Sequence, residues 1–178
     1  MSEKKRPYEK AKKEMRLSER IAAELPGFRG YKEKEIRRET DKLIRNHLYR
    51  KLREATDSVK DVFRELSERR VQEVLTDMDR LVMKFDRVAE KINHASYGYT
   101  GFFNVVKVEE DKLDEMIEFD SNLTDRVQKI VDEASAFKKE VMKCEVEKVR
   151  EHIGNLRDLL ESLEETFDER GETILGVK

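Results

Sequence analysis

Residues 93–104 read NHASYGYTGFFN and separate two long runs of mixed charged and apolar residues. Gly98 and Gly101 are the only glycines between Gly30 and Gly154. Because glycine readily adopts the left-handed backbone that ends a helix, this pair predicts a turn. The stretch therefore predicts the tip of a helical hairpin, at which the chain reverses and lets the two runs pack together.

The same stretch is rich in aromatic side chains. The candidate interaction tip consists of Tyr97, Tyr99, Phe102 and Phe103. Large aromatic side chains are usually mostly buried, so one interpretation is that these rings fill the end of the bundle where two helices diverge. The other interpretation is an exposed aromatic surface on which a protein partner docks.

The two flanking runs carry helical seams. Residues 31–92 contain no proline or glycine, and most of their apolar positions are spaced by three and four, as are those of residues 109–168. The step from Leu66 to Val71 is five, which predicts a local change in coiled-coil winding. We predict a long helix over 31–92, a tip over 93–108 and a return helix over 109–168.

The pattern leaves open whether these helices are continuous. A helix of about 60 residues would be about 90 Å long, which is typical of an antiparallel coiled coil. The alternative is that the helices break at Asp57 or Asp120 and fold back, so that one chain covers itself. Asp120 is the only charged residue on the return seam, and with the next two residues it can cap a new helix. Gly154 marks another candidate break.

Composition predicts an all-α fold. The 178 residues are 37% hydrophobic and 44% charged, with two prolines and no tryptophan, which favours long solvated helices with narrow apolar seams in one domain over 1–178. Cys144 is the single cysteine, so no internal disulfide is expected and a reducing cytoplasm is predicted. The N-terminal residues lack the apolar core of a signal peptide, and no apolar run is long enough to predict a membrane span.

The two ends of the chain differ in pattern. Residues 1–26 predict a short amphipathic helix that begins near Pro7 and ends before Pro26 and Gly27. Its apolar or small face consists of Tyr8, Ala11, Met15, Ser18, Ala22 and Leu25. Residues 169–178 offer few anchors, so a frayed tail is predicted there.

Charge is uneven along the chain. Residues 1–53 hold 18 Lys and Arg against 9 Asp and Glu, whereas residues 54–178 hold 20 against 31. The candidate basic surface consists of Arg37, Arg38, Lys42, Arg45, Arg50, Lys51 and Arg53. Such a surface can bind nucleic acid or an anionic membrane. In a hairpin, however, it would lie beside the acidic residues 157–172, and the two charges would neutralise each other.

The sequence contains no motif for catalysis, a cofactor or a metal ion. None of His47, His94 and His152 has a glutamate three residues before it, so the Glu-x-x-His signature of di-iron bundles is absent. The glycines three apart at 27–30 and 98–101 lack the further glycine and the lysine of a phosphate-binding loop. We therefore predict a non-enzymatic protein without a cofactor or a bound metal.

Apolar residues beside the seams predict a homodimer. Leu75, Val82 and Ala89 recur every seven residues beside the first seam, and Ile117 and Val131 flank the return seam. These residues widen the apolar face beyond what one partner helix can cover. A second chain would cover them and give a four-helix cross-section.

Two stretches carry a resemblance to other proteins. LPGFRGYKEKEIRRETDKLIR, residues 25–45, and HASYGYTGFFNVVKV, residues 94–108, resemble segments of an uncharacterised group of prokaryotic helical proteins. They cover about a fifth of the chain. The resemblance implies no activity, site or partner.

Two classes of function are consistent with this pattern. The first is a helical interaction or scaffold protein, which acts through its surface on a protein partner that the sequence does not identify. The second is a protein that binds nucleic acid or an anionic surface through Lys and Arg in residues 4–53.

Overall fold

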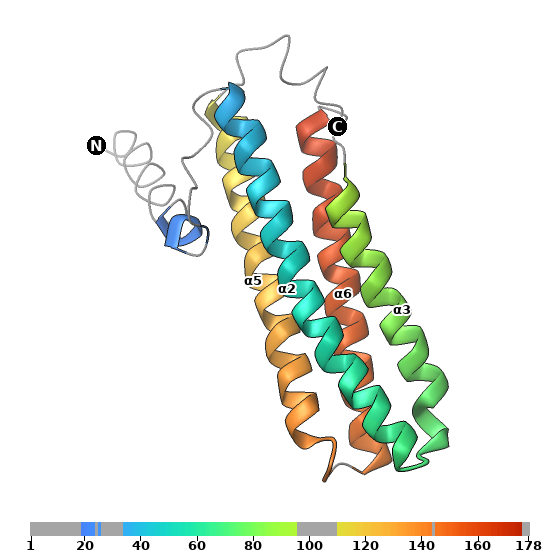
Figure 1. The fold of residues 1–178 in the computed structure, drawn as a ribbon. Coiled ribbons are helices and arrows are strands. Elements are labelled where there is room, and N and C mark those ends of the chain that lie inside the picture. Colours follow the sequence, from blue (N-terminus) through green and yellow to red (C-terminus); the bar gives the residue numbers. More distant parts are fainter. Residues whose placement is uncertain (1–18, 24, 26–33, 96–109, 144, 176–178) are drawn as a thin grey trace, which may run out of the picture.

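The structure is a computed structural model that describes residues 19–23, 25, 34–95, 110–143 and 145–175, with side chains at 19–23, 25, 40–95, 115–143 and 145–172. Its long helices are α2 (Lys34–Glu68), α3 (Gln72–His94), α5 (Glu110–Glu140) and α6 (Val146–Leu175). They lie side by side in a bundle (Figure 1). The predicted all-α class and helical bundle are confirmed. No described helix is long and apolar enough to cross a membrane.

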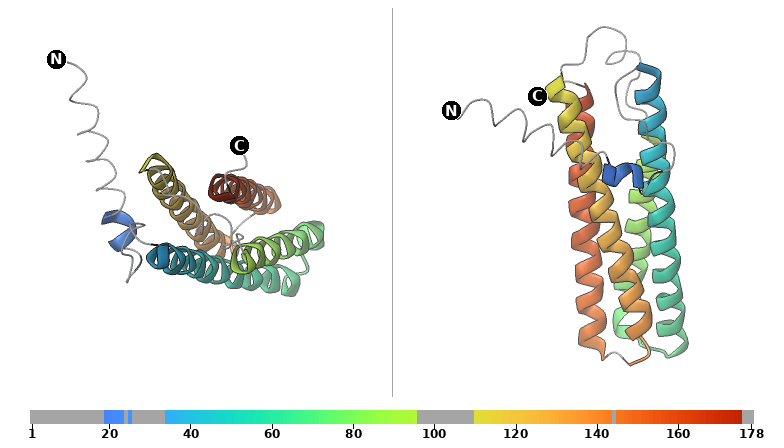
Figure 2. Two further views of the ribbon diagram at one scale, coloured as in Figure 1. Left: turned by 90° about the horizontal axis from the view of Figure 1, so that it is seen from above. Right: turned by 90° about the vertical axis from the view of Figure 1, so that its left-hand side faces the viewer.

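Each long helix has two neighbours in the bundle. α2 packs against α3 and α5, and α6 packs against α5 and α3, so α2 lies diagonally opposite α6. α2 and α5 run in one direction while α3 and α6 run in the other (Figures 1 and 2). We call the end at which α2 and α5 begin the upper end, as drawn in Figure 1. Residues 26–33 and 96–109 both connect to helices at this end.

The five-residue step from Leu66 to Val71 marks the end of a helix. The Val71 N–H donates to the Leu66 carbonyl and the Arg70 N–H donates to the Ser67 carbonyl, both at 3.0 Å. Arg70 has a left-handed backbone with φ of 60°. These two bonds around a left-handed residue form the Schellman motif, in which apolar residues five apart commonly touch. The predicted helix over 31–92 is therefore two helices, α2 and α3.

The predicted return helix over 109–168 is also two helices, because the chain turns again between α5 and α6. Arg69 Nη1 donates to the Val141 carbonyl at 2.6 Å and so joins the two turns at the lower end. The helices thus fold back, as the second alternative proposed. They do so at these two turns, whereas Asp57 and Asp120 lie inside α2 and α5.

Two expectations for the last helix are wrong. α6 continues through Gly154, which was a candidate break, and it runs on to Leu175. A frayed tail is predicted over 169–178, yet residues 169–175 are helical and Arg170 is 1% exposed, which anchors this end of α6 in the bundle; residues 176–178 lie outside the described residues. An arginine seldom serves as a core anchor, which is why the sequence pattern did not indicate it.

Gly154 offers a stability test. A Cβ atom built at this position would meet nothing within 4 Å. Glycine inside a helix costs about 0.5–1 kcal/mol relative to alanine, so Gly154→Ala should raise the free energy of unfolding by that amount. Urea unfolding followed by circular dichroism measures the change. A loss of stability in Gly154→Ala would show that the helix is not regular there.

The core is a single apolar seam shared by the four helices. Its largest fully buried apolar side chains in these helices are Ile44, Leu48, Leu52, Leu66, Met78, Phe85, Ile92, Met116, Leu123 and Phe137. Ala89 is also buried, and Leu75, Val82, Ile117 and Val131 are half-buried against this core. The residues that motivated a homodimer therefore pack within their own chain. One chain forms the four-helix cross-section that the pattern predicted from two.

A short N-terminal segment is attached to this bundle. Residues 19–23 are helical and lie beside α5 and α2, at the level of Asp125 in the middle of α5 (blue in Figures 1 and 2). Ile21 and Leu25 are buried and belong to the core cluster. Ala22, which was predicted to lie on the buried face together with Leu25, is exposed. The rest of the predicted helix over 1–26 lies outside the described residues.

Candidate functional site

A cluster of buried charges lies near the upper end of the bundle. The Arg170 guanidinium of α6 donates from Nε to Asp120 Oδ1 of α5 at 2.6 Å, and from Nη1 to Asp41 Oδ1 of α2 at 2.8 Å. Arg45 donates from Nε to the other Asp41 oxygen at 2.9 Å, and from Nη1 to the Asn93 carbonyl of α3 at 3.2 Å. We call Asp41, Arg45, Asp120 and Arg170 the buried ionic cluster. It links all four long helices.

Helical periodicity places these charges in the core. Asp41 precedes buried Ile44 by three residues, Asp120 precedes buried Leu123 by three, and Arg170 follows buried Phe167 by three. Each charged residue therefore continues an apolar seam. The interpretation of Asp120 as a helix cap is wrong, since it lies inside α5 and is 0% exposed. The sequence did not indicate Asp41 and Arg170 as core residues, because a charged residue beyond the last apolar position of a seam is usually exposed.

Burial dominates the electrostatics of the cluster. It raises the pKa of the Asp120 carboxyl, while the charge and hydrogen bond of Arg170 act in the opposite direction without cancelling the shift. Two arginines face two aspartates, so the formal charges balance. Balanced pairs are needed here, because a single uncompensated charge in a protein interior is strongly destabilising.

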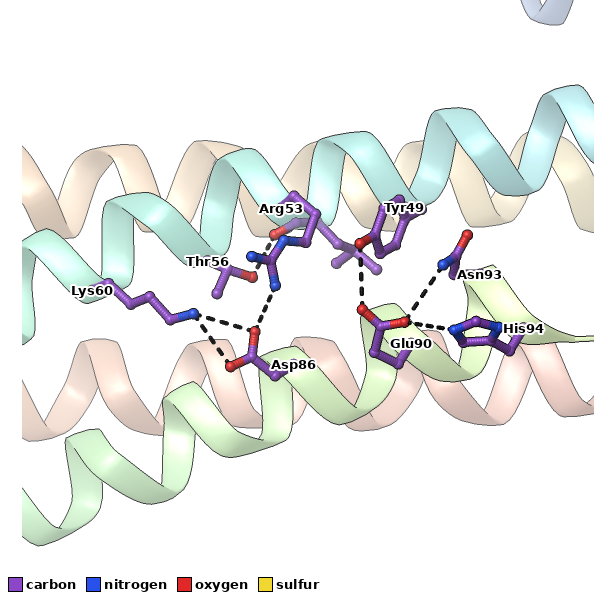
Figure 3. A network of polar contacts seen from close by, with 9 residues as sticks. Tyr49, Arg53, Thr56, Lys60, Asp86, Glu90, Asn93 and His94 are labelled. Carbon is purple, nitrogen blue, oxygen red and sulfur yellow. Dashed lines mark hydrogen bonds and ion pairs between the residues drawn. The ribbon is translucent and has the colours of Figure 1, made fainter.

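A second polar network connects α2 with α3 on the bundle surface (Figure 3). Asp86 of α3 accepts hydrogen bonds from Arg53 Nη1 at 2.7 Å and from Lys60 Nζ at 3.3 Å. One turn further along α3, Glu90 accepts a hydrogen bond from the Tyr49 hydroxyl at 3.3 Å. These contacts join the two helices on the bundle surface, outside the apolar core that they share.

The candidate basic surface is partly used inside the bundle. Arg45 belongs to the buried ionic cluster, Arg53 pairs with Asp86, and Lys51 lies 3.5 Å from a glutamate of its own helix. Lys42 and Arg50 are exposed. The side chains of Arg37 and Arg38 lie outside the described residues. Among the residues whose side chains the structure describes, the candidate basic surface therefore does not form one exposed patch.

The acidic carboxy-terminal stretch pairs with α3. Lys84 lies 3.2 Å from Glu161, and Lys91 lies 2.7 Å from Asp168. Between them, Arg87 donates two hydrogen bonds to Glu164, at 2.8 and 2.9 Å. In each of these three pairs the partners are 77 residues apart, which means that α3 and α6 run parallel in constant register. The expectation that this stretch lies beside the basic part of α2 is wrong, because α2 and α6 are diagonal.

Glu164 predicts a pH dependence. Burial raises its pKa, but the hydrogen bonds and charges of Arg87 and Lys91 outweigh burial and hold the pKa below the ordinary 4.5. A carboxylate whose pKa is depressed in the folded state stabilises the protein at pH values above its ordinary pKa. This stabilisation is lost as the pH falls from the ordinary pKa through the folded-state pKa. Glu164→Gln should therefore cost about 0.5–1 kcal/mol at neutral pH and almost nothing at about pH 3. Urea unfolding at both pH values tests this, with exposed Glu165→Gln as the control that should change stability at neither.

The histidines have structural partners. The His152 ring stacks on the Phe137 ring with centroids 4.7 Å apart, and its Nδ1 lies 2.9 Å from Glu133 Oε1. His94 Nε2 lies 3.1 Å from Glu90 Oε2, and His47 is buried. Within the described part of the chain, no group of three or more His, Cys, Asp and Glu side chains is arranged to hold a metal ion. Cys144 lies outside it.

The candidate interaction tip lies outside the described residues. Its four aromatic residues belong to the connection between α3 and α5 at the upper end of the bundle. α3 ends at His94, and Ala95 follows with an extended backbone. The buried ionic cluster lies at the same end of the bundle. Residues 96–109 therefore connect to the part of the bundle that this cluster holds together.

Comparison with known proteins finds no match among protein-family models, curated proteins or solved structures. The resemblance of residues 25–45 and 94–108 to an uncharacterised prokaryotic group therefore stays a prediction.

Proposed function

We propose that this protein is a non-enzymatic helical interaction or scaffold protein, and that the upper end of its bundle binds a protein partner. The observation that carries the proposal is the buried ionic cluster at that end. Arg170 reaches Asp41 and Asp120 together only when α2, α5 and α6 take one mutual arrangement. The cluster therefore supports a defined geometry at the end of the bundle to which residues 26–33 and 96–109 connect.

Energetics supports this interpretation. Apolar residues of similar volume often replace a buried ion pair without loss of stability, so stability alone is a weak reason to keep one. A recognition surface on the connections between helices, in contrast, benefits when the helices that hold those connections are rigid. Residues 27–31 and 98–102, which leave this end, share glycines three apart followed by an aromatic residue. Aromatic residues are enriched in the cores of protein interfaces.

A capture experiment tests the proposal. The tip variant replaces Tyr97, Tyr99, Phe102 and Phe103 with serine. The control variant replaces Met83 and Met142, which are 64% and 62% exposed and lie away from the upper end, with serine. We expect proteins from the source cells to be retained by the full chain and by the control, but lost from a folded tip variant. Equal retention by the tip variant would contradict the proposal.

Nucleic-acid or anionic-surface binding is the alternative function, and exposed Lys42 and Arg50 are the observation that favours it. Binding through phosphate contacts weakens steeply as salt rises from about 50 to 200 mM, whereas aromatic docking responds little. We expect no strongly salt-dependent binding to a DNA duplex or to anionic vesicles. Tight binding at low salt that is lost in Lys42→Glu with Arg50→Glu would establish the alternative instead.

The proposal requires only one chain. Leu75 and Val82, which motivated the homodimer, are half-buried within the bundle, so we expect a monomer in sedimentation equilibrium at micromolar concentration. A dimer would call for a different interface. We also propose a cytoplasmic location, which rests on the single cysteine of the sequence.

A further inference from the structure

A groove lies on the bundle surface between α5 and α6. Its apolar lining is Ala136 and Leu159, and its acidic lining is Asp132, Glu133 and Asp158. Lys129 and Asn155 also line it. A shallow groove that combines two apolar residues with three acids suits a basic amphipathic helix, whose apolar face would contact Ala136 and Leu159 while its cations meet the acids.

The N-terminal segment is fixed to the bundle next to this groove. Arg20 Nη2 donates to Asp125 Oδ1 at 2.8 Å. Asp125, Lys129, Asp132 and Ala136 are spaced by four, three and four, so they form one stripe on the face of α5. Arg20 thus contacts the upper end of the stripe that lines the groove. From Asp125 to Ala136 the stripe is about 16 Å long, at 1.5 Å per residue.

Residues 1–18, which precede this anchor, have the composition that the groove requires. They hold 7 Lys and Arg against 3 Asp and Glu, whereas residues 110–175 hold 10 against 20. Tyr8, Ala11 and Met15 are spaced by three and four, which is one face of a helix. As a helix, 18 residues would span about 27 Å, more than the length of the stripe.

The contacts of Arg20, Ile21 and Leu25 with the bundle leave part of the apolar face of the N-terminal segment uncovered. Ala22 follows Met15 by seven residues and so continues the face of Tyr8, Ala11 and Met15. Ala22 is exposed, while neighbouring Ile21 and Leu25 are buried. The bundle therefore covers Leu25 at the end of the predicted face but leaves Ala22, the position that precedes it on that face, uncovered.

We propose that residues 1–18 dock in the α5–α6 groove of their own chain, with Tyr8, Ala11 and Met15 toward Ala136 and Leu159. The lysines and arginines of the segment then face Asp132, Glu133 and Asp158. Docking withdraws seven cationic side chains from external anionic partners. The inference is independent of the function proposed for the upper end.

Paramagnetic broadening in the full chain tests the proposal. A spin label is attached at Lys13→Cys, on the side of the expected helix opposite Tyr8, Ala11 and Met15, in a Cys144→Ser background, and amide signals are recorded on the ¹⁵N-labelled protein. We expect loss of intensity at residues 129–136 and 155–159, but not at residues 40–44 near the start of α2, which is diagonal to α6 and begins at the upper end of the bundle, above the level of the groove. The charge reversal Asp132→Lys with Asp158→Lys should restore the signals. The matched reversal of exposed acids elsewhere, Asp57→Lys with Asp79→Lys, should leave the broadening in place.

Three results would contradict the proposal. Full intensity throughout α5 and α6 would show that residues 1–18 do not dock there. Broadening that appears only when a spin-labelled chain is mixed with a separate ¹⁵N-labelled chain would show that a second copy fills the groove. If the amide signals of the groove residues stayed broadened after Asp132→Lys with Asp158→Lys, the acidic residues would not be needed for docking.

Discussion

Arg170→Met is expected to lower the free energy of unfolding by about 3–5 kcal/mol at neutral pH, because removing one partner of a buried ion pair leaves an uncompensated charge. Asp41 would keep its contact with Arg45 at 2.9 Å, whereas Asp120 would lose its ion pair with Arg170. Burial already raises the pKa of Asp120. Without Arg170, the carboxyl should bind a proton more readily still.

The pH dependence of this variant has a definite sign. When the pKa of a carboxyl is higher in the folded state than in the unfolded state, the free energy of unfolding of the protein falls as the pH rises from the unfolded-state pKa through the folded-state pKa. The cost of Arg170→Met should therefore be smaller at about pH 5 than at pH 7. Adding Asp120→Leu removes the uncompensated charge and should recover most of the loss at pH 7. Urea unfolding of the single and double variants measures both effects.

Arg157→Met is the matched control for Arg170→Met. The Arg157 side chain is 63% exposed on the same helix, so its replacement should change stability by less than about 0.5 kcal/mol. If Arg170→Met cost no more than this control, the buried ionic cluster would not hold the upper end together. The geometric support for the proposed binding end would then be lost as well.

Phe137→Ala is expected to cost about 3–5 kcal/mol, the usual range for removing a buried aromatic side chain and leaving a cavity. Phe137 is 0% exposed on α5, and the ring of His152 from α6 stacks on it. The substitution therefore removes core volume and a contact between two helices. Thermal or urea unfolding should show the loss.

Exposed Met142 supplies the control for Phe137→Ala. Met142 lies in the turn that follows α5 and is 62% exposed, so Met142→Ala should stay within about 0.5 kcal/mol of the parent chain. A cost below about 1 kcal/mol for Phe137→Ala would show that α5 and α6 do not share a packed core at this level.

Much of the fold could be predicted because apolar spacing is a local property. The steps of three and four identified nearly every buried seam residue, from Leu48 to Ile92 and from Met116 to Phe167. The five-residue step from Leu66 to Val71 was also visible, but two physical causes produce such a step. It can mark a change of coiled-coil winding or a Schellman turn, and the left-handed Arg70 decides for the turn.

Less of the candidate site could be predicted. The periodicity that identifies Phe167 as buried also reaches Arg170, and the one that identifies Ile44 reaches Asp41. A charged residue on a seam has no evident place in the core unless an opposite charge meets it there. Asp41 and Arg170 are 129 residues apart, so local spacing could not reveal their pairing.

The helical class, the inward face of each helix and the places where the seams change phase could all be predicted from local patterns, because each depends on residues within a few turns of one another. Which helices become neighbours depends instead on contacts between distant parts of the chain. The fold-back at two turns placed α6 beside α3 and diagonal to α2, so Glu161, Glu164 and Asp168 meet the cations of α3. It also covered Leu75 and Val82 within one chain. These outcomes depend on how four seams close around a common core, which no single stretch of sequence encodes.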